Sequence, residues 1–87
     1  MISKEYTVNN PSGLHLRPAT VFSQICAKLS SDIRIKFKDK VVNPKSVLML
    51  MGAGITKGSE ILIEVEGPNE EADMAKVLEA LDGGLGE

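Results

Sequence analysis

The chain has 87 residues, 43% of them hydrophobic and 25% charged, and its formal net charge at pH 7 is −2. This length predicts a single domain over residues 1–87, and the composition argues against intrinsic disorder. No apolar stretch approaches the ~18 residues that span a bilayer, and no secretory signal opens the chain, so we expect a cytoplasmic protein without membrane insertion. One cysteine and one histidine cannot form an intramolecular disulfide or a Cys/His zinc site, so we expect no metal or cofactor.

The charges are divided unevenly along the chain. Residues 1–45 contain eight basic and three acidic residues, a net charge of +5, whereas residues 46–87 contain two basic and nine acidic residues, a net charge of −7. This asymmetry can steer an acidic partner toward one face. The basic residues at 34, 36 and 38 alternate with apolar ones, so the simpler interpretation is the solvated face of a strand. With three aromatic residues and a slightly acidic balance, we expect no direct binding of nucleic acid.

Hydrophobic periodicity predicts short elements in the order β-α-β-β-α-β-α. In chain order they are a strand over 2–8, a helix over 16–29, strands over 33–37 and 41–42, a helix over 47–51, a strand over 60–66 and a helix from 70 to 81. Short strands with one apolar face, interleaved with amphipathic helices, indicate an α+β fold. We expect the helices on one side of a mixed or antiparallel sheet.

Several side chains of these elements have a predicted environment. Cys26 lies on the apolar stripe of the first helix and is expected to be a small core residue without chemistry. The three glutamates of the strand over 60–66 are expected to face water, and the tail over 84–87 is expected to fray. The apolar residues of the final helix recur at helical spacing. Its predicted buried stripe is Ala72, Ala75, Leu78 and Leu81.

The single histidine, His15, lies two residues before Arg17 and three before Pro18. Proline is tolerated in the first turn of a helix, where its missing N–H would have no intrahelical partner, so a helix is predicted to begin at or just after His15. Backbone amides point outward at a helix start, and the helix dipole favours negative charge there. An imidazole, a guanidinium and a helix start together indicate a site for a phosphoryl group. The alternative is a surface or capping histidine.

A second helix start is predicted at Ser46. A serine at this point is typical of a helix N-cap, and a hydroxyl at a helix start can also accept a phosphate without disrupting the helix. The helix that follows has only about two turns, so its apolar residues cannot all face inward: Val47, Leu48, Leu50 and Met51. Either some of them form an exposed patch, which often marks a docking surface, or all but one belong to the core.

Two motifs at this spacing carry a family resemblance. The segment Gly13-Leu14-His15-Leu16-Arg17-Pro18-Ala19, with Lys45-Ser46-Val47-Leu48 and Gly54-Ile55 downstream, closely resembles the HPr family of histidine-containing phosphocarriers. That family belongs to the phosphoenolpyruvate-dependent sugar phosphotransferase system. The resemblance covers essentially all 87 residues. It implies an open-faced β-sandwich, in which a four-stranded antiparallel sheet is covered on one face by three helices (βαββαβα).

The resemblance also implies a function centred on His15. Its δ1 nitrogen would accept a phosphoryl group from phosphorylated Enzyme I and pass it to an enzyme IIA domain of a sugar permease. A neutral imidazole nitrogen suits this relay, because it is both a good nucleophile toward phosphorus and a good leaving group. The backbone amides of Leu16 and Arg17 would bind the phosphoryl oxygens. The Arg17 side chain would pair with the phosphoryl group or with acidic side chains of a partner. The chain would then be a monomeric carrier and not an independent enzyme.

Lys45-Ser46 resembles the regulatory site of HPr from low-GC Gram-positive bacteria. There an ATP-dependent HPr kinase/phosphorylase would modify Ser46, and the product would bind a catabolite-control transcription factor. The surface that receives partners would flank His15. By resemblance it consists of Leu16, Thr20, Val47, Leu48 and Met51.

Two positions depart from the family pattern. Leu16 replaces the alanine that usually follows the active histidine, and Met49 stands where Gram-positive members often have glycine. These departures leave open a specialised paralogue that acts in nitrogen control or in a dihydroxyacetone phosphorylation relay. A purely regulatory paralogue that acts in catabolite repression is the other alternative, but that paralogue lacks the active histidine, whereas His15 is present here.

Overall fold

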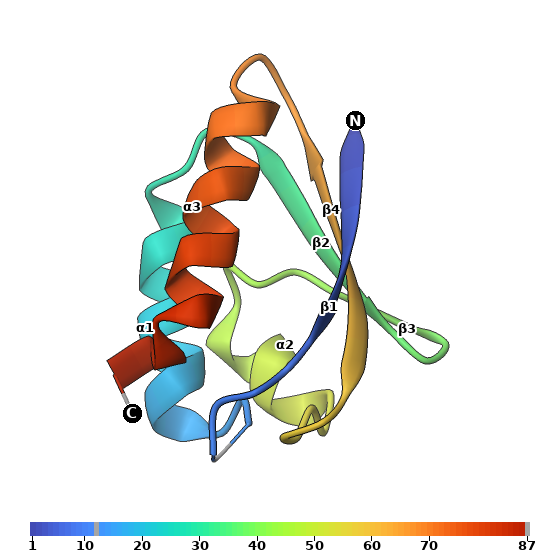
Figure 1. Ribbon diagram of the computed structural model, residues 1–87, viewed down its shortest axis with the longest axis vertical. Helices are drawn as coiled ribbons and strands as arrows, with labels where there is room; N and C mark the ends of the chain where they lie inside the picture. The colour runs from blue at the N-terminus through green and yellow to red at the C-terminus, as the bar shows by residue number, and fades with distance from the viewer. Residues whose placement is uncertain (12, 87) are drawn as a thin grey trace.

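Three helices cover one face of a four-stranded antiparallel sheet in the computed structural model, which describes residues 1–11 and 13–86 (Figure 1). The strands are β1 (Ile2–Thr7), β2 (Asp32–Phe37), β3 (Lys40–Val42) and β4 (Glu60–Glu66). The helices are α1 (Leu16–Ala27), α2 (Val47–Gly52) and α3 (Glu70–Asp82), followed by a 3₁₀ turn at Gly84–Gly86. The predicted α+β fold and the order βαββαβα are confirmed.

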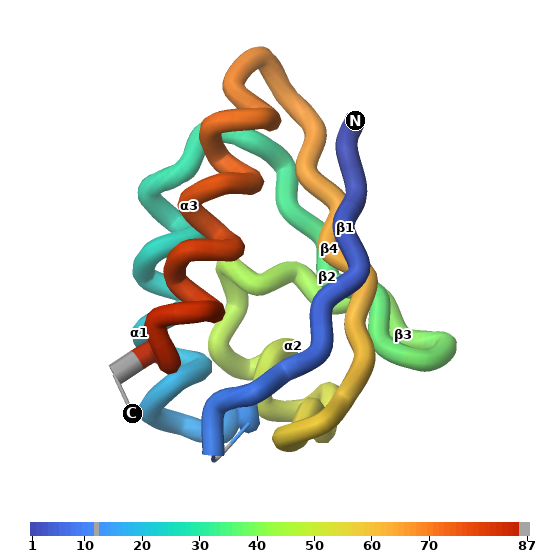
Figure 2. The backbone as a smooth tube through the Cα atoms, viewed as in Figure 1, coloured from blue at the N-terminus to red at the C-terminus, as the bar shows by residue number. Residues whose placement is uncertain are grey.

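The sheet has the order β1-β4-β2-β3, so the late strand β4 lies between two early ones. It pairs antiparallel with β1 and with β2, and the tube in Figure 2 shows these three segments side by side. Ile63 of β4 lies opposite Lys4 of β1 on one side and opposite Ile35 of β2 on the other. A strand from the acidic second half of the chain therefore pairs with two strands from the basic first half.

The core lies between the sheet and the helices. Strand alternation turns one side of β2 and β4 toward the helices, so that Ile35 and Ile63 are fully buried. Phe22 of α1 is also fully buried in this cluster, and shortening it to alanine is expected to cost about 3–5 kcal/mol. Cys26 is buried beside it, and this burial raises the pKa of the thiol to about 12. It is a core residue, as predicted. Among the described residues, every helix is too short or too polar to cross a membrane.

Helix α3 buries only part of its predicted stripe, because Leu81 is buried as predicted but the other three residues are not fully buried. Ala72 and Ala75 are exposed and Leu78 is half-buried. The buried residues are Asp73, Met74, Val77 and Leu81. The rotation of the helix follows from two causes: larger apolar side chains gain more than alanine from burial, and Asp73 accepts two hydrogen bonds from Ser31. The Ser31 N–H and hydroxyl donate to Oδ2 of Asp73 at 3.1 Å and 2.5 Å.

The described residues after α3 are ordered and pack against the rest of the protein. Leu85, in the 3₁₀ turn, is 3% exposed and belongs to the hydrophobic core. The turn packs against α1. The expectation of a frayed tail is therefore wrong for residues 84–86, because Leu85 gains apolar burial by folding back. Glu87 lies outside the described residues.

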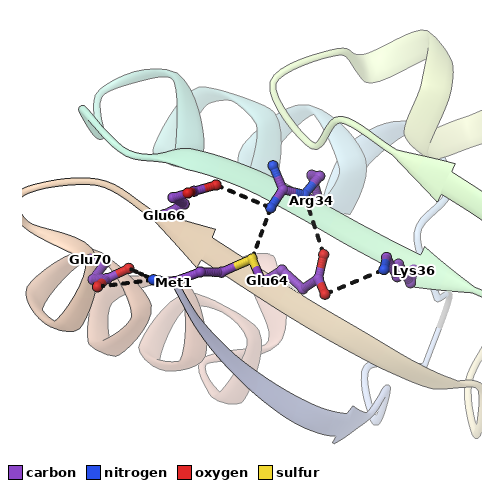
Figure 3. Close-up of polar contacts among 6 residues, drawn as sticks. All are labelled: Met1, Arg34, Lys36, Glu64, Glu66 and Glu70. Carbon is purple, nitrogen blue, oxygen red and sulfur yellow. Dashed lines mark hydrogen bonds and ion pairs between the residues drawn. The ribbon is translucent and has the colours of Figure 1, made fainter.

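The prediction that the glutamates of β4 all face water is wrong for Glu64. Its neighbours Glu60 and Glu66 are exposed, but Glu64 is 7% exposed because β4 is central and basic side chains of β2 cover it. Nε of Arg34 donates to Oε1 of Glu64 at 3.2 Å, and Nζ of Lys36 lies 3.4 Å from Oε2 (Figure 3). The hydrogen bond from Arg34 is the main reason that the pKa of Glu64 lies below its ordinary value. Arg34 and Lys36 thus occupy the solvated face of the strand, as predicted.

Candidate functional site

His15 is the N-cap residue of α1, where the sequence predicts a helix start. Its backbone is extended (φ −81°, ψ −171°), and its carbonyl accepts the first helical hydrogen bond from the Ala19 N–H at 2.8 Å. Its side chain makes no capping hydrogen bond, and the residue is exposed. The imidazole therefore does not cap the helix, and it is accessible from solvent, which the alternative of a surface histidine also allows.

The backbone just before His15 is held by buried contacts. Gly13 adopts φ +60°, and a Cβ at this position would lie 2.6 Å from the Ile55 carbonyl oxygen and 2.6 Å from the Thr56 Cα. Leu14 is 2% exposed, and its N–H donates to the Ile55 carbonyl at 3.0 Å. The buried side chain of Asn10 donates to the Gly13 carbonyl, and the Gly13 N–H donates back to the Asn10 carbonyl at 3.0 Å. These contacts place the start of α1 on the core.

The first turn of α1 has two backbone donors without a partner in the described part of the chain. Within the described residues, no acceptor binds the N–H of Leu16 or of Arg17, and Pro18 has no N–H. These two donors and the positive end of the helix dipole lie directly after the imidazole. The Arg17 side chain is exposed, and among the described residues it forms no ion pair. The arrangement combines an exposed imidazole, two amide donors and a guanidinium without an ion pair among the described residues.

Ser46 is the N-cap residue of α2, as predicted. Its hydroxyl oxygen accepts a hydrogen bond from the Met49 N–H at 3.3 Å, and its own N–H donates to the Asn43 carbonyl at 2.9 Å. The side chain is half-buried. The cap is therefore formed, and the hydroxyl remains partly accessible.

The residue before Ser46 ties α2 to α1. Nζ of Lys45 donates to the carbonyls of Leu29 and Ser31, each at 3.1 Å, beyond the end of α1. The Lys45 carbonyl accepts a hydrogen bond from the Ser23 hydroxyl of α1 at 2.9 Å. These hydrogen bonds hold the start of α2 in a fixed position relative to α1.

Apolar side chains are exposed on both helices. On α2, Leu48 is 82% and Met51 is 42% exposed, whereas Leu50 is fully buried. On α1, Leu16 is 64% exposed. The prediction of an exposed patch is confirmed, and the alternative that all but one of these residues are core is wrong. We call the set the apolar surface: Leu16, Thr20, Val47, Leu48 and Met51.

The apolar surface spans two packed helices. Helices α1 and α2 contact each other, and Figure 1 shows the first turn of α1 and the whole of α2 at the same end of the molecule. Val47 and Thr20 are half-buried, and the Thr20 hydroxyl donates to the Leu16 carbonyl at 2.6 Å. The surface therefore lies at the same end of the molecule as His15.

Sequence reasoning missed the residues that hold the loop before His15. The histidine motif includes Gly13, but neither that motif nor the periodicity of the chain indicates the hydrogen bond of Asn10 or the close contact of Gly13 with Ile55. The signal that could have found them is an asparagine three residues before a glycine, because asparagine side chains often bond nearby backbone in turns. Nothing local to this segment indicates that Ile55 is its partner.

Comparison with known proteins identifies the family. A family model described as "PTS HPr component phosphorylation site" matches residues 2–82. The chain belongs to the HPr family. This is the family of the HPr phosphocarrier of the phosphotransferase system, and its members are not independent catalysts. The resemblance inferred from the two sequence motifs is therefore confirmed.

Solved structures of the family superpose closely on this chain. HPr-C-His from Thermoanaerobacter tengcongensis is 32% identical, with a TM-score of 0.93 and coverage of 100% of this chain and 98% of that one. Phosphocarrier protein HPr from Bacillus anthracis str. Ames is 32% identical, with a TM-score of 0.87 and coverage of 92% and 95%. The catabolite repression protein Crh from Bacillus subtilis is 27% identical, with a TM-score of 0.75 and coverage of 97% of each chain. The chain is thus similar to phosphocarriers and to a catabolite-repression protein at comparable identity.

Proposed function

We propose that the chain carries a phosphoryl group on Nδ1 of His15, taken from phosphorylated Enzyme I and passed to an enzyme IIA domain of a sugar permease. One observation carries this proposal: an exposed imidazole at the start of α1 lies beside two backbone donors that have no partner among the described residues. The similarity to HPr structures supports it.

The proposed chemistry is a direct transfer between two imidazoles. A neutral nitrogen of His15 attacks phosphorus and forms an N–P bond, while the N–P bond of the donor phosphohistidine breaks. The imidazole left on Enzyme I takes up a proton and is neutral, and the phosphorylated ring of His15 releases the proton of its other nitrogen. Negative charge on the transferred oxygens is met by the N–H groups of Leu16 and Arg17 and by the helix dipole. The guanidinium of Arg17 adds a charge-assisted hydrogen bond to these oxygens, or else pairs with acidic side chains of the partner.

The apolar surface is the proposed docking site for both partners. Leu48 and Leu16 are the most exposed large apolar residues that it contains. Burying such side chains at the centre of an interface, with a charged group such as Arg17 at its edge, is typical of specific contacts between proteins. The same surface would serve Enzyme I and enzyme IIA in turn, since both must reach the same imidazole.

Ser46 is the proposed regulatory site. An HPr kinase/phosphorylase would transfer a phosphoryl group from ATP to its hydroxyl, and a catabolite-control transcription factor would bind the product. The added charge of about −1.5 to −2 is favourable at the start of α2 but unfavourable beside an apolar docking surface. Phosphorylation of Ser46 is therefore expected to slow transfer to His15.

A second candidate function is that of a specialised or purely regulatory paralogue in catabolite repression or nitrogen control. The similarity to Crh favours it. The formed site around His15 favours the carrier, because a regulator that works through Ser46 alone has no use for an exposed imidazole with free donors beside it.

The decisive experiment is transfer from Enzyme I with labelled phosphoenolpyruvate. The wild-type chain should take up an acid-labile label, His15→Ala should take up none, and Ser46→Ala should be labelled like the wild type. A label that persists in His15→Ala contradicts the carrier function. The absence of any label in the wild-type chain favours the purely regulatory paralogue.

A further inference from the structure

Helix α2 exposes two methionines to a similar extent. Met49 is 45% and Met51 is 42% exposed, whereas Met74 in α3 is 6% exposed. Successive residues of a helix are about 100° apart, so Met49 and Met51 lie on opposite sides of the buried Leu50. Their thioethers are the accessible oxidisable groups of α2.

The two side chains face different surroundings. Met51 lies one turn after Val47 and shares its side of the helix, so it belongs to the apolar surface. Met49 instead lines a shallow hollow on the other side of α2, together with Arg34 of β2 and Val41 of β3. Met49 is thus a control within the same helix: it is as exposed as Met51 but lies outside the apolar surface.

We propose that Met51 is a redox modification site at which a hydroperoxide switches off partner docking. This inference rests on the proposed function, because it concerns regulation of the same surface. The sulfur attacks one peroxide oxygen, the O–O bond breaks, and an S–O bond forms. The departing group, hydroxide from hydrogen peroxide or alkoxide from an organic hydroperoxide, takes the proton from the oxygen bound to sulfur and leaves as water or as an alcohol. The sulfur is oxidised by two electrons, and the peroxide is reduced. The product is methionine sulfoxide, which places a polar group within the apolar surface.

The buried thiol does not compete for the oxidant. Cys26 is fully buried, and its pKa of about 12 keeps it protonated near neutral pH, whereas the thiolate is the form that reacts. Methionine oxidation needs no deprotonation. Peroxide is therefore directed to the exposed methionines.

Mass spectrometry tests the site independently of any partner. After treatment with hydrogen peroxide, trypsin releases residues 46–57 with both α2 methionines and residues 58–76 with Met74. We expect Met49 and Met51 to be oxidised on the order of tenfold faster than Met74, with Cys26 unmodified. Oxidation of Met51 no faster than that of Met74 overturns the proposal.

Transfer from Enzyme I tests the consequence, with each variant compared before and after oxidation. Peroxide should lower the transfer rate of the wild type about tenfold, since a polar group then replaces an apolar contact. The rate of Met51→Leu should change less than about twofold on oxidation, whereas that of Met49→Leu should fall as in the wild type. A thiol-dependent methionine sulfoxide reductase should restore the wild-type rate.

The outcomes separate this proposal from the proposed function. If the untreated chain accepts no phosphoryl group, the carrier function fails, while the mass spectrometry still decides whether Met51 is oxidised. If the untreated chain is active and oxidation leaves its rate unchanged, or if Met49→Leu is the protected variant, the docking switch fails. A thermal unfolding midpoint that falls together with the rate also overturns it, because unfolding would then explain the loss.

Discussion

The starts of α1 and α2 differ in what their polar groups already bind. At α1 the side chain of His15 caps nothing, and the N–H groups of Leu16 and Arg17 have no partner among the described residues. At α2 the hydroxyl of Ser46 accepts the Met49 N–H and closes the first turn of its own helix. The start of α1 is open to an incoming phosphoryl group. At the start of α2, a phosphate on Ser46 would have to replace the hydroxyl as the acceptor of the Met49 N–H.

The two starts are also held by different means. Before α1, Gly13 packs closely against the backbone of Ile55 and Thr56, and the Leu14 N–H donates to the Ile55 carbonyl, so the anchor combines close packing with backbone hydrogen bonds. Before α2, Lys45 is held by hydrogen bonds to carbonyls beyond α1. A change in the first anchor should therefore disturb the His15 site, and a change at the second helix start should mainly cost stability.

The largest effect is expected from Gly13→Ala. The added Cβ would clash with the backbone of Ile55 and Thr56 and would strain a positive φ, so we expect a loss of about 3 kcal/mol in the free energy of unfolding. Displacement of the loop should also slow transfer from Enzyme I about 100-fold. Urea unfolding and the transfer assay measure the two effects. Gly54→Ala is the control, because Gly54 has a similar φ of +73° but open space around it. Equal losses in the two variants would contradict the steric anchor.

Arg17→Gln tests the open start of α1. Removing the guanidinium should slow transfer about tenfold, because a charge-assisted hydrogen bond is lost. Unfolding should be almost unchanged, since Arg17 is exposed and forms no ion pair among the described residues. A fall in kcat indicates contact with the phosphoryl group, and a rise in KM indicates contact with the partner. Lys28→Gln, at the other end of α1, should accept the phosphoryl group at the wild-type rate. An equal loss in that variant would mean that Arg17 acts only through the net charge of the protein.

Ser46→Ala tests the closed start of α2. Loss of the cap should cost about 1 kcal/mol of stability in urea unfolding, while transfer to His15 continues. Ser46→Thr retains a hydroxyl acceptor and should recover most of that loss. Ser46→Asp should slow transfer by placing negative charge beside the apolar surface, and a rate equal to that of the wild type would count against the proposed coupling.

The smallest effect is expected far from both helix starts, at Glu64. Arg34 lowers the pKa of this glutamate, so its ion pairs contribute fully to stability above the ordinary value of 4.5. The contribution shrinks as the pH falls below that value and is gone once the pH has passed the folded pKa. Glu64→Gln should therefore flatten the acid side of the stability profile, measured by urea unfolding from about pH 3 to pH 7. Glu60→Gln, at an exposed position of the same strand, should leave the profile unchanged. Neither substitution should change the rate of transfer from Enzyme I.

The sequence by itself determined the order and type of the elements, and it located both helix starts. Alternation and helical spacing are local patterns, and they are sufficient for βαββαβα. Pro18 marks the first turn of α1, and Ser46 is an N-cap because its hydroxyl oxygen can accept a backbone N–H of the first turn. The two motifs also identified the family, since their residues and spacing can be taken directly from the sequence. The roles of His15, Arg17 and Ser46 in transfer and regulation remain predictions.

Only the tertiary structure decided which neighbours these local elements meet. The order β1-β4-β2-β3 places Glu64 beneath Arg34 and Lys36, so a residue predicted to face water is buried. The hydrogen bonds from Ser31 hold Asp73 in the buried stripe of α3, whereas Ala72 and Ala75 of the predicted stripe are exposed. Contact with Ile55, some forty residues along the chain, holds the loop before His15. Periodicity reports which side of an element is apolar, but the partner of each side chain depends on contacts between segments distant in the chain.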